Sequence, residues 1–371
     1  MSSDFVLADY HGNSLNNLIP SLLARLDGET PTIKVPEASR YVVVLVDGLG
    51  SEQLDRFADH TDRLAGMRRQ RLTCGVPSTT ATSLTSLGCG VTPGLHGVTG
   101  YTFYEEGCDA VVNALTWEGG PEDIESFRQV PTQFRRMRAG GRSGATVTLG
   151  RFDGSALTQL AFSGAESYPR EDEDEVERTV DLVSESLERH EIVYCYERLL
   201  DHRGHGYGVG SWQWLDQLGA VDDLVSGLVS LASEDVCVLV TGDHGMVNVP
   251  ADHRLTIEEV PALDGFHHVG GEGRFRQLYT DDPRRLAWAW RSVLGERAEV
   301  LVKDEAIEAG WFGEVVTDPT RARIGDVVVA MNADWALMST TFPGEFGLVG
   351  MHGSLTPEEM YVPLLQAGGR E

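Results

Sequence analysis

Carboxylate and imidazole side chains follow three β-branched runs of the sequence, at the point where each run ends. The six residues are Asp47, Asp201, His205, Asp243, His244 and, in a later Val-Gly-Met-His-Gly-Ser segment, His352. In open parallel sheets, ligands bind outside the carboxyl ends of the strands, so these side chains are expected to meet at one edge. Three carboxylates and three imidazoles supply the oxygen and nitrogen ligands of two sites for zinc or a similar transition metal.

Each of these residues has a simpler explanation when it is taken alone. An aspartate that precedes glycine after a strand is commonly a turn former. Adjacent Asp-His pairs also occur at Asp201-His202 and Asp252-His253, and we do not expect either adjacent pair to bind a metal together. Gly204 lets the chain approach an ion closely, which favours His205 over His202 as the partner of Asp201. The combination of all six residues is what favours metal binding.

A hydroxyl-rich segment supplies a candidate nucleophile. Ser78, Thr79 and Thr80 follow Pro77 and open an apolar pattern at helical spacing. Free backbone N–H groups at a helix N-terminus attract a phosphoryl group, and a metal-bound hydroxyl can become a nucleophile. Helix capping by Ser78 or Thr79 is the structural alternative. Spacing alone does not choose between Thr79 and Thr80.

Apolar β-branched runs alternate with helical patterns along the chain. This alternation predicts an α/β fold, a three-layer α/β/α sandwich with a mostly parallel central sheet. We expect one catalytic domain over residues 1–371, with a smaller subdomain or lid at about 249–345, where the alternation is interrupted. The predicted strands are 41–46, 145–149, 192–196, 236–241 and 327–331, and the predicted helices are 14–26, 79–87, 176–187, 212–231 and 283–293.

Composition limits the partners of this chain. Its 57 acidic residues against 30 lysines and arginines give a formal net charge of -27, which disfavours nucleic-acid polymers and anionic membranes. No apolar run approaches a membrane span, and the N-terminus lacks a signal-peptide pattern. The five scattered cysteines form no C-x-x-C pair, so we expect reduced thiols and a cytoplasmic protein. The oligomeric state is not indicated.

The order of these motifs resembles the alkaline phosphatase superfamily, and within it the nucleotide pyrophosphatase/phosphodiesterase branch. The resemblance runs from Asp47 through the threonine segment, Asp-x-x-Gly-His-x-Tyr-Gly and Gly-Asp-His-Gly-Met to His352. It implies two divalent metal ions, most commonly zinc, with manganese or another transition metal as alternatives. One ion would be held by Asp47, Asp243, His244 and the nucleophile, and the other by Asp201, His205 and His352.

The same resemblance assigns further roles. Counting back from the Pro-x-x-His-Gly turn at 93–97 places the nucleophilic threonine at Thr80 and makes His96 structural. Tyr196 matches a position that offers an aromatic ring to the substrate's base, and a buried strand residue is its alternative. Ser83 stands where relatives carry an asparagine that holds a phosphoryl oxygen, so we expect a single hydroxyl hydrogen bond there.

The resemblance implies a metal-dependent hydrolase of a small phosphorylated substrate, namely a nucleotide-type phosphodiester, with a phospho-threonine intermediate. Alternatives are a phosphomonoesterase, a phosphate-transferring mutase and a metal-stabilised binding protein. The segment Cys74-Gly-Val-Pro-Ser does not fit a sulfatase. In the 249–345 region, Arg274 or Arg276 is a candidate phosphate contact, and the segments at 266–268, 270–274 and 311–312 are candidates for closing over the metals.

Overall fold

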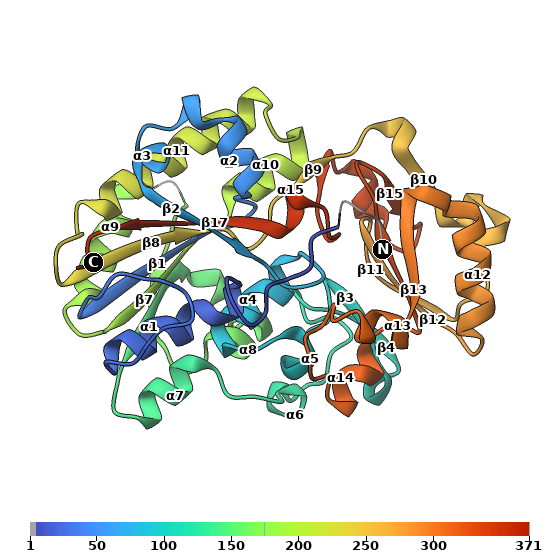
Figure 1. The fold of residues 1–371 in the computed structure, drawn as a ribbon, viewed down its shortest axis with the longest axis horizontal. Helices are drawn as coiled ribbons and strands as arrows, with labels where there is room; N and C mark the ends of the chain where they lie inside the picture. The colour runs from blue at the N-terminus through green and yellow to red at the C-terminus, as the bar shows by residue number, and fades with distance from the viewer. Residues whose placement is uncertain (1–4, 174, 371) are drawn as a thin grey trace.

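The computed structural model describes residues 5–173 and 175–370, and within them a seven-stranded sheet forms the centre of the molecule (Figure 1). The strands stand in the order β2-β17-β8-β1-β7-β5-β6. Their bounds are Arg68–Thr73 (β2), Tyr361–Ala367 (β17), Val236–Thr241 (β8), Arg40–Val46 (β1), Ile192–Glu197 (β7), Gly144–Leu149 (β5) and Glu166–Arg170 (β6). β1, β5, β6, β7 and β8 pair in parallel, whereas β17 runs antiparallel to both of its neighbours.

The central strand β1 shows why helices cover both faces of this sheet. Val42, Val44 and Val46 join one apolar cluster, which includes residues of α9 and α11. Tyr41, Val43 and Leu45 belong to another, which includes residues of α1 and α4. Successive side chains of a strand point to opposite faces, so a continuous apolar run requires cover on both. The predicted α/β fold with a mostly parallel central sheet is confirmed.

Helices α4, α8, α10 and α11 are the ones relevant to the site. Helix α4 begins within one residue of the helix start predicted from the sequence. The α-helices are Leu18–Leu26 (α1), Ser51–Arg56 (α2), Arg63–Gly66 (α3), Thr80–Cys89 (α4), Pro93–His96 (α5), Ile124–Phe127 (α6), Gln133–Ala139 (α7), Ala156–Phe162 (α8), Val176–Leu187 (α9), Leu199–Tyr207 (α10), Trp212–Val229 (α11), Pro283–Leu294 (α12), Lys303–Glu308 (α13), Asp318–Arg323 (α14) and Pro357–Met360 (α15).

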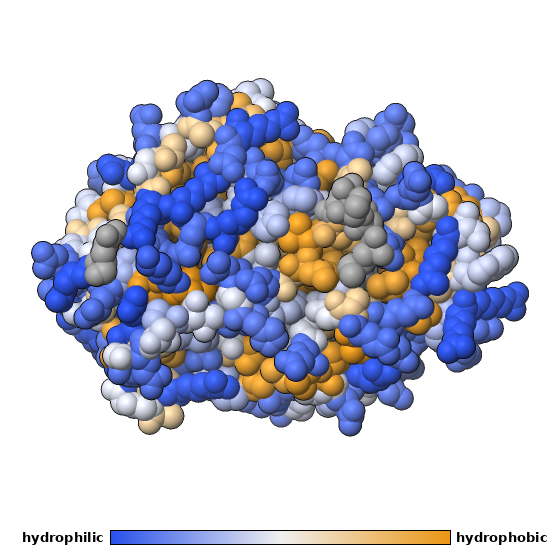
Figure 2. Space-filling view, in the orientation of Figure 1, coloured by the Kyte–Doolittle hydropathy of each residue, from blue (hydrophilic) through white to orange (hydrophobic). Residues whose placement is uncertain are grey.

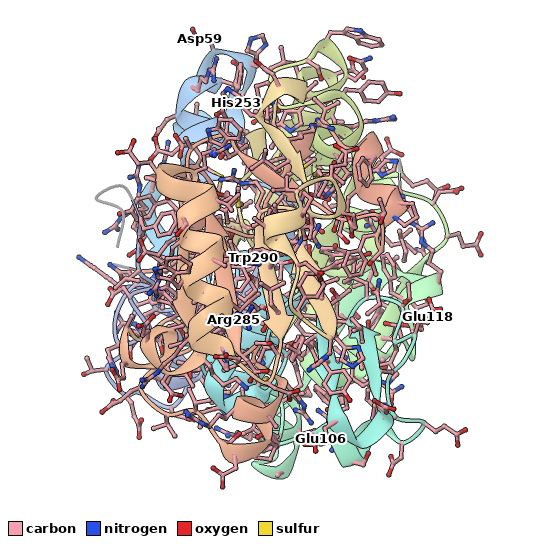
Figure 3. The ribbon with its side chains drawn as sticks, turned by 90° about the vertical axis from the view of Figure 1, so that its right-hand side faces the viewer. Asp59, Glu106, Glu118, His253, Arg285 and Trp290 are labelled. Atoms are coloured by element: carbon pink, nitrogen blue, oxygen red, sulfur yellow. The ribbon has the colours of Figure 1, made fainter. Side chains whose placement is uncertain are left out.

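A second sheet lies beside the first and contains, in the described ranges, four antiparallel strands in the order β11-β12-β14-β13. These strands are His268–Glu272 (β11), Phe275–Tyr279 (β12), Ala298–Val302 (β13) and Val327–Met331 (β14). Helix α12 packs on this sheet, and its Trp290, labelled in Figure 3, is fully buried. The segment predicted as a strand at 327–331 is β14, which belongs to this antiparallel sheet and not to the central sheet. All five of its residues are buried, and a continuous apolar run does not reveal which sheet a strand joins.

Short two-stranded pairings complete the fold. They are Thr102–Glu105 (β3) with Ala110–Asn113 (β4), Arg254–Thr256 (β10) with Ala336–Met338 (β15), and Val247–Asn248 (β9) with Gly350–Met351 (β16). The β3–β4 hairpin contacts the second sheet through β11, and β16 contacts α10. These contacts bring the second sheet and the chain around 350 next to the carboxyl ends of β1 and β7.

Hydrophilic side chains cover most of the face drawn in Figure 2, and apolar side chains show between them in separate patches. This distribution agrees with the large acidic excess of the sequence. Among the described residues, no helix combines the length and the apolar character that a membrane crossing requires.

Candidate active site

The carboxyl ends of three parallel strands place most of the predicted ligands. Asp47 follows β1, Asp243 follows β8, and Asp201 lies in the first turn of α10, just after β7. Gly48 has a φ of 73°, and a Cβ on it would come within 3.0 Å of the Asp201 Cα. Glycine is therefore required where the β1 loop approaches α10, because another residue would be strained and would push the two aspartates apart.

The three histidines present the same ring nitrogen to the site. The Nδ1 atoms of His205, His244 and His352 lie 2.8, 2.9 and 3.0 Å from the backbone oxygens of Gly350, Gly245 and Ser78. A carbonyl oxygen only accepts, so each Nδ1 carries the proton and each Nε2 is left with a free lone pair. This arrangement is typical of histidines that bind metals.

The Nε2 atoms lie close to the aspartate oxygens. His205 Nε2 is 3.3 Å from Asp201 Oδ2, and His352 Nε2 is 4.0 Å from Asp201 Oδ1. His244 Nε2 is 3.5 Å from Asp47 Oδ1 and 3.5 Å from Asp243 Oδ2. Carboxylate and imidazole atoms at these separations can share a cation placed between them.

Among the described residues, two groups of three have ligand atoms that all lie within 4.8 Å of one another: Asp201, His205 and His352, and Asp47, Asp201 and His244. The structure thus brings together all six residues that the sequence singled out. Asp201 stands between the two groups. Asp243 sits at the side of the second, where its Oδ1 accepts hydrogen bonds from the backbone N–H groups of Gly48 and His244.

Burial and mutual repulsion disfavour the ionised form of these carboxyl groups. Burial raises the pKa of Asp47 well above its ordinary value, and the nearby Asp243 and Asp201 raise it further. Burial is also the main cause that raises the pKa of Asp243. Asp201 Oδ1 and Asp243 Oδ2 are buried and have no hydrogen-bond partner among the described residues. Burial lowers the pKa of His352, with His244 and His205 adding to the effect, so that ring supplies no charge.

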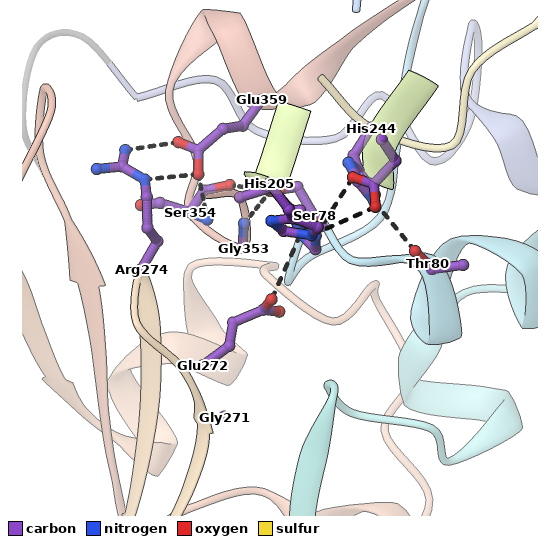
Figure 4. A network of polar contacts seen from close by, with 12 residues as sticks. Ser78, Thr80, His205, His244, Gly271, Glu272, Arg274, Gly353, Ser354 and Glu359 are labelled. Carbon is purple, nitrogen blue, oxygen red and sulfur yellow. Dashed lines mark hydrogen bonds and ion pairs between the residues drawn. The ribbon is translucent and has the colours of Figure 1, made fainter. Parts of the chain in front are cut away.

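Thr80 is the first residue of α4, and Thr79 is its N-cap. Thr80 Oγ1 lies 3.2 Å from His244 Nε2 and 3.4 Å from Asp47 Oδ1, at the end of the polar network in Figure 4. Thr79 contacts Glu272 instead. The geometry therefore separates the two threonines that spacing alone does not distinguish. His96 is buried against Ser86, with 2.9 Å between Nε2 and Oγ, and belongs to the packing of α4 as expected.

Tyr196 and Ser83 occupy different surroundings. Tyr196 is half-buried on the wall of the cavity, and its hydroxyl donates a hydrogen bond to Asp47 Oδ2. Ser83 is fully buried behind Thr80, next to Cys74, and does not line the cavity. The structure therefore gives Ser83 no surface on which to hold a phosphoryl oxygen.

The arginines considered as phosphate contacts form buried ion pairs with glutamates instead. Arg274 is fully buried and forms a bidentate ion pair with Glu359, with 2.8 and 2.7 Å between the paired atoms (Figure 4). Arg276 is fully buried against Glu345. Trp311 and Phe312, considered for closing over the metals, are also fully buried in the core. These expectations were wrong. The position of a residue near a glycine-rich segment of the sequence does not show whether its side chain faces the cavity.

Glu272 is a site residue that the sequence did not single out by itself. It ends β11, and its Oε2 lies 3.4 Å from His352 Nδ1. Burial raises the pKa of Glu272 well above its ordinary value, and its Oε1 has no hydrogen-bond partner in the described chain. Its only sequence signal is its place in the Gly-Gly-Glu-Gly-Arg segment, because the pairing of β11 with β12 is what turns it toward His352.

Several of these groups open into one cavity of about 1110 Å³. Asp47, Thr80, Asp201, His205 and His352 line it, whereas Asp243 and His244 do not. An O/N ligand cluster beside a hydroxyl at a helix N-terminus, at the end of a large cavity, can bind a phosphate ester and attack it.

Comparison with known proteins gives the family of this chain. Residues 41–355 match the family described as type I phosphodiesterase / nucleotide pyrophosphatase. The chain belongs to that family. Its members are phosphoric ester hydrolases, which agrees with the enzyme class expected from the motifs. No match was found among curated protein sequences.

Solved structures share the fold of this family member. Murine ectonucleotide pyrophosphatase/phosphodiesterase 5 is 16% identical, with a TM-score of 0.70, and the match covers 89% of this chain and 88% of that chain. The human protein of the same name is 14% identical, with a TM-score of 0.68 and the same coverage. Phosphonoacetate hydrolase from Sinorhizobium meliloti 1021, in complex with phosphonoformate, is 19% identical, with a TM-score of 0.66 over 89% of this chain and 90% of that chain.

Proposed function

We propose that this chain is a metal-dependent phosphodiesterase that acts on nucleotide-type diesters and uses Thr80 as its nucleophile. The observation that carries the proposal is the position of Thr80 Oγ1, 3.2 Å from His244 Nε2 and 3.4 Å from Asp47 Oδ1. A hydroxyl so placed beside a cluster of metal-type ligands, at the start of α4, is suited to attack on phosphorus.

The donor set fits two divalent cations. Asp47, Asp243, His244 and Thr80 would hold one, and Asp201, His205 and His352 the other. Zinc suits this mixture of imidazole and carboxylate, and manganese is the alternative. Unpartnered carboxylate oxygens on Asp201 and Asp243, buried next to three histidine Nε2 atoms, support the assignment, because such a site is costly without a cation. When bound, the cations would lower the pKa of the threonine hydroxyl and offset the charge of the phosphoryl oxygens.

The chain's own residues define the remaining chemistry. Thr80 Oγ1 attacks phosphorus in line with the departing alcohol oxygen, so one P–O bond forms as another breaks. The phosphoryl group is then carried on Thr80 at the N-terminus of α4, where free backbone N–H groups favour its negative charge. Attack by water on phosphorus releases the monoester and restores the threonine, with net retention of configuration at phosphorus.

Two structural neighbours are consistent with a small phosphorylated substrate. An inactive threonine-to-alanine variant of the murine phosphodiesterase is described in complex with AMP, and its match has a TM-score of 0.68 at 15% identity. The bacterial neighbour is described in complex with phosphonoacetate as well as phosphonoformate. The free thiols of Cys74, Cys89, Cys108, Cys195 and Cys237 support a cytoplasmic location as part of this proposal.

Replacing Thr80 tests the nucleophile. We expect Thr80→Ala to lower kcat for a nitrophenyl nucleotide diester by at least about 10³-fold, while the bound metal stays near the wild-type amount, because three side-chain ligands remain at that site. Thr79→Ala is the matched control and should retain most of the activity. Metal is quantified in each sample before assay. An active, metal-loaded Thr80→Ala variant would contradict the assignment.

The preference for diesters is tested on the wild-type protein. A nitrophenyl nucleotide diester and a nitrophenyl phosphate monoester are compared before chelation, after chelation and after restoration with zinc or manganese. We expect metal-restored activity with the diester preferred. A preference for the monoester would make the protein a phosphomonoesterase, and inactivity toward both with two bound metals would contradict the hydrolase proposal.

A further inference from the structure

We propose that the cavity selects diesters that carry a single phosphate and an uncharged aromatic or apolar substituent, and that it disfavours substrates with a second anionic group, including polyphosphates. This inference rests on the proposed function. Three features of the cavity beyond the metal ligands support it: an aromatic wall, buried hydroxyls without partners, and a described lining that offers no unpaired lysine or arginine.

Four aromatic rings form one wall of the cavity. Phe162 stacks on Tyr194 with 4.2 Å between ring centroids, and Tyr194 stacks on Tyr196 with 6.4 Å between theirs. Phe152 meets Tyr196 edge-on at 6.0 Å. All four rings line the cavity, as does Leu84, which is one helical turn beyond Thr80. A flat or apolar substituent on the reacting phosphate would lie against this wall and bury apolar surface there.

Two hydroxyls on the same wall lack partners. The Tyr194 hydroxyl and Thr148 Oγ1 are buried and make no hydrogen bond to any described residue, although their side chains are only 1% and 6% exposed. Buried polar groups without partners are rare in native proteins, and each costs about 1–3 kcal/mol unless a ligand or water satisfies it. Both residues line the cavity, so a neutral polar atom on the substrate can reach them. A hydrogen-bonding atom of the substrate can therefore satisfy these hydroxyls.

The cavity offers little positive charge away from the metal ligands. Among the described residues that line it, Arg198 is the one arginine or lysine, and it is paired with Glu173 through contacts of 2.8 Å. Glu118 lines the same cavity, and Figure 3 shows it at the edge of the molecule. Glu345, also on the wall, is already paired with Arg276. A second phosphate or a carboxylate on the substrate would enter this cavity without a free cation to offset its charge, and an unpaired charge is costly to bury.

The test uses two diesters that differ by one remote charge. Phenyl 4-nitrophenyl phosphate has a neutral substituent, and 4-carboxyphenyl 4-nitrophenyl phosphate adds a carboxylate at the same ring with the same leaving group. With metal-quantified protein, we expect kcat/KM to favour the neutral diester by roughly tenfold or more, the size of one lost charge-assisted hydrogen bond. ATP should be hydrolysed with an even lower kcat/KM than the carboxylated diester.

Binding without turnover gives a second readout. Calorimetry on the Thr80→Ala variant with phenyl phosphate and with 4-carboxyphenyl phosphate should give the same preference in Kd. Equal or tighter binding of the carboxylated ligand would overturn the inference, whatever the turnover shows.

A charge introduced at the mouth of the cavity should change the preference. Leu115 lines the cavity and is 41% exposed, so an arginine there can be accommodated without repacking a core. We expect Leu115→Arg to shift the ratio of the two kcat/KM values toward the carboxylated diester by several-fold, and Leu115→Gln to leave that ratio unchanged. Because only the ratio is compared, a general loss of activity cancels.

The outcomes separate the inference from the proposed function. Hydrolysis of both diesters without a preference for the neutral one overturns the inference and leaves the phosphodiesterase proposal intact. If Arg198→Ala lowered kcat/KM only for the carboxylated diester, the inference would also be overturned, because Arg198 would then be the contact for a second anion. Inactivity toward both diesters in metal-loaded protein overturns the proposed function itself.

Discussion

Single side chains in this site are held by partners outside it. The Tyr196 hydroxyl donates to Asp47 Oδ2, and the three histidines donate from Nδ1 to backbone carbonyls. Such contacts fix the orientation of a ligand before a metal arrives, so their removal weakens binding without removing a ligand. The Tyr196 hydroxyl thus orients Asp47, and this contact leaves its ring on the cavity wall, where sequence resemblance predicts a substrate contact.

We expect Tyr196→Phe to weaken metal binding by about 10–100-fold, because the ring remains while the hydrogen bond to Asp47 is lost. The measurement is a competition titration of the metal-free protein with zinc and a chromophoric chelator. Tyr207→Phe is the control, since Tyr207 is exposed at the end of α10. Unchanged zinc affinity combined with weaker substrate binding would instead assign Tyr196 to the substrate.

The raised pKa of Glu197 predicts that the free energy of unfolding depends on pH. Burial raises the pKa of Glu197 from 4.5 to about 7, against hydrogen bonds from the backbone N–H groups of Leu199 and Leu200 that lower it. Between these two pH values the folded protein holds a proton that the unfolded chain has released, so the free energy of unfolding falls as pH rises. The loss approaches about 3 kcal/mol by pH 8.

Glu197→Gln should remove this part of the pH dependence and raise stability at pH 8. Urea unfolding of wild type and variant at pH 5 and pH 8 measures it. Glu185→Gln, a change at an exposed position of α9, should keep the wild-type dependence. Parallel curves for wild type and Glu197→Gln would show that Glu197 titrates normally.

At the scale of elements, buried ion pairs join the second sheet to the main one. Arg274 lies in the turn between β11 and β12, and Glu359 lies in α15, directly before β17. Glu359 also accepts hydrogen bonds from Ser354 N and Thr356 Oγ1. The pair therefore ties the strand that carries Glu272 to the segment that follows His352, and so holds the two sides of the site together.

Breaking this pair should be costly. Arg274→Met leaves the Glu359 carboxylate buried without its cation, so we expect the free energy of unfolding to fall by about 3–5 kcal/mol. Chemical denaturation of the metal-free protein measures this loss, and Arg284→Met on the exposed face of α12 should change stability by less than about 0.5 kcal/mol. A stable Arg274→Met variant with weakened phosphate binding would contradict the structural role.

At the scale of the whole molecule, a net charge of -27 and a site of buried carboxylates make cation binding and stability dependent on each other. Ions that bind only the folded state stabilise it, by about 2.7 kcal/mol at a hundredfold excess over Kd. They also reduce the repulsion between Asp47, Asp201 and Asp243 within the site.

Zinc should therefore raise the thermal unfolding midpoint of the metal-free protein, and chelation should reverse the effect. In Asp201→Asn the zinc-induced shift should shrink strongly, because Asp201 belongs to both ligand groups, while the metal-free form becomes more stable as repulsion is relieved. Asp252→Asn, at an exposed Asp-His pair away from the site, should keep the full shift. An undiminished shift in Asp201→Asn would place the metal elsewhere.

The local pattern of the chain was enough to predict the α/β class, five of the strands, five of the helices and the residues at the strand ends. Apolar periodicity and the carboxyl-end rule are local properties, and they placed Asp47, Asp201 and Asp243 near one edge. Tertiary structure alone decided the rest: that Thr80 rather than Thr79 meets His244, that Arg274 pairs with Glu359, and that Glu272 and the aromatic wall enter the cavity. These depend on which face of an element meets which neighbour, and contacts between distant segments leave no periodic signal in the sequence.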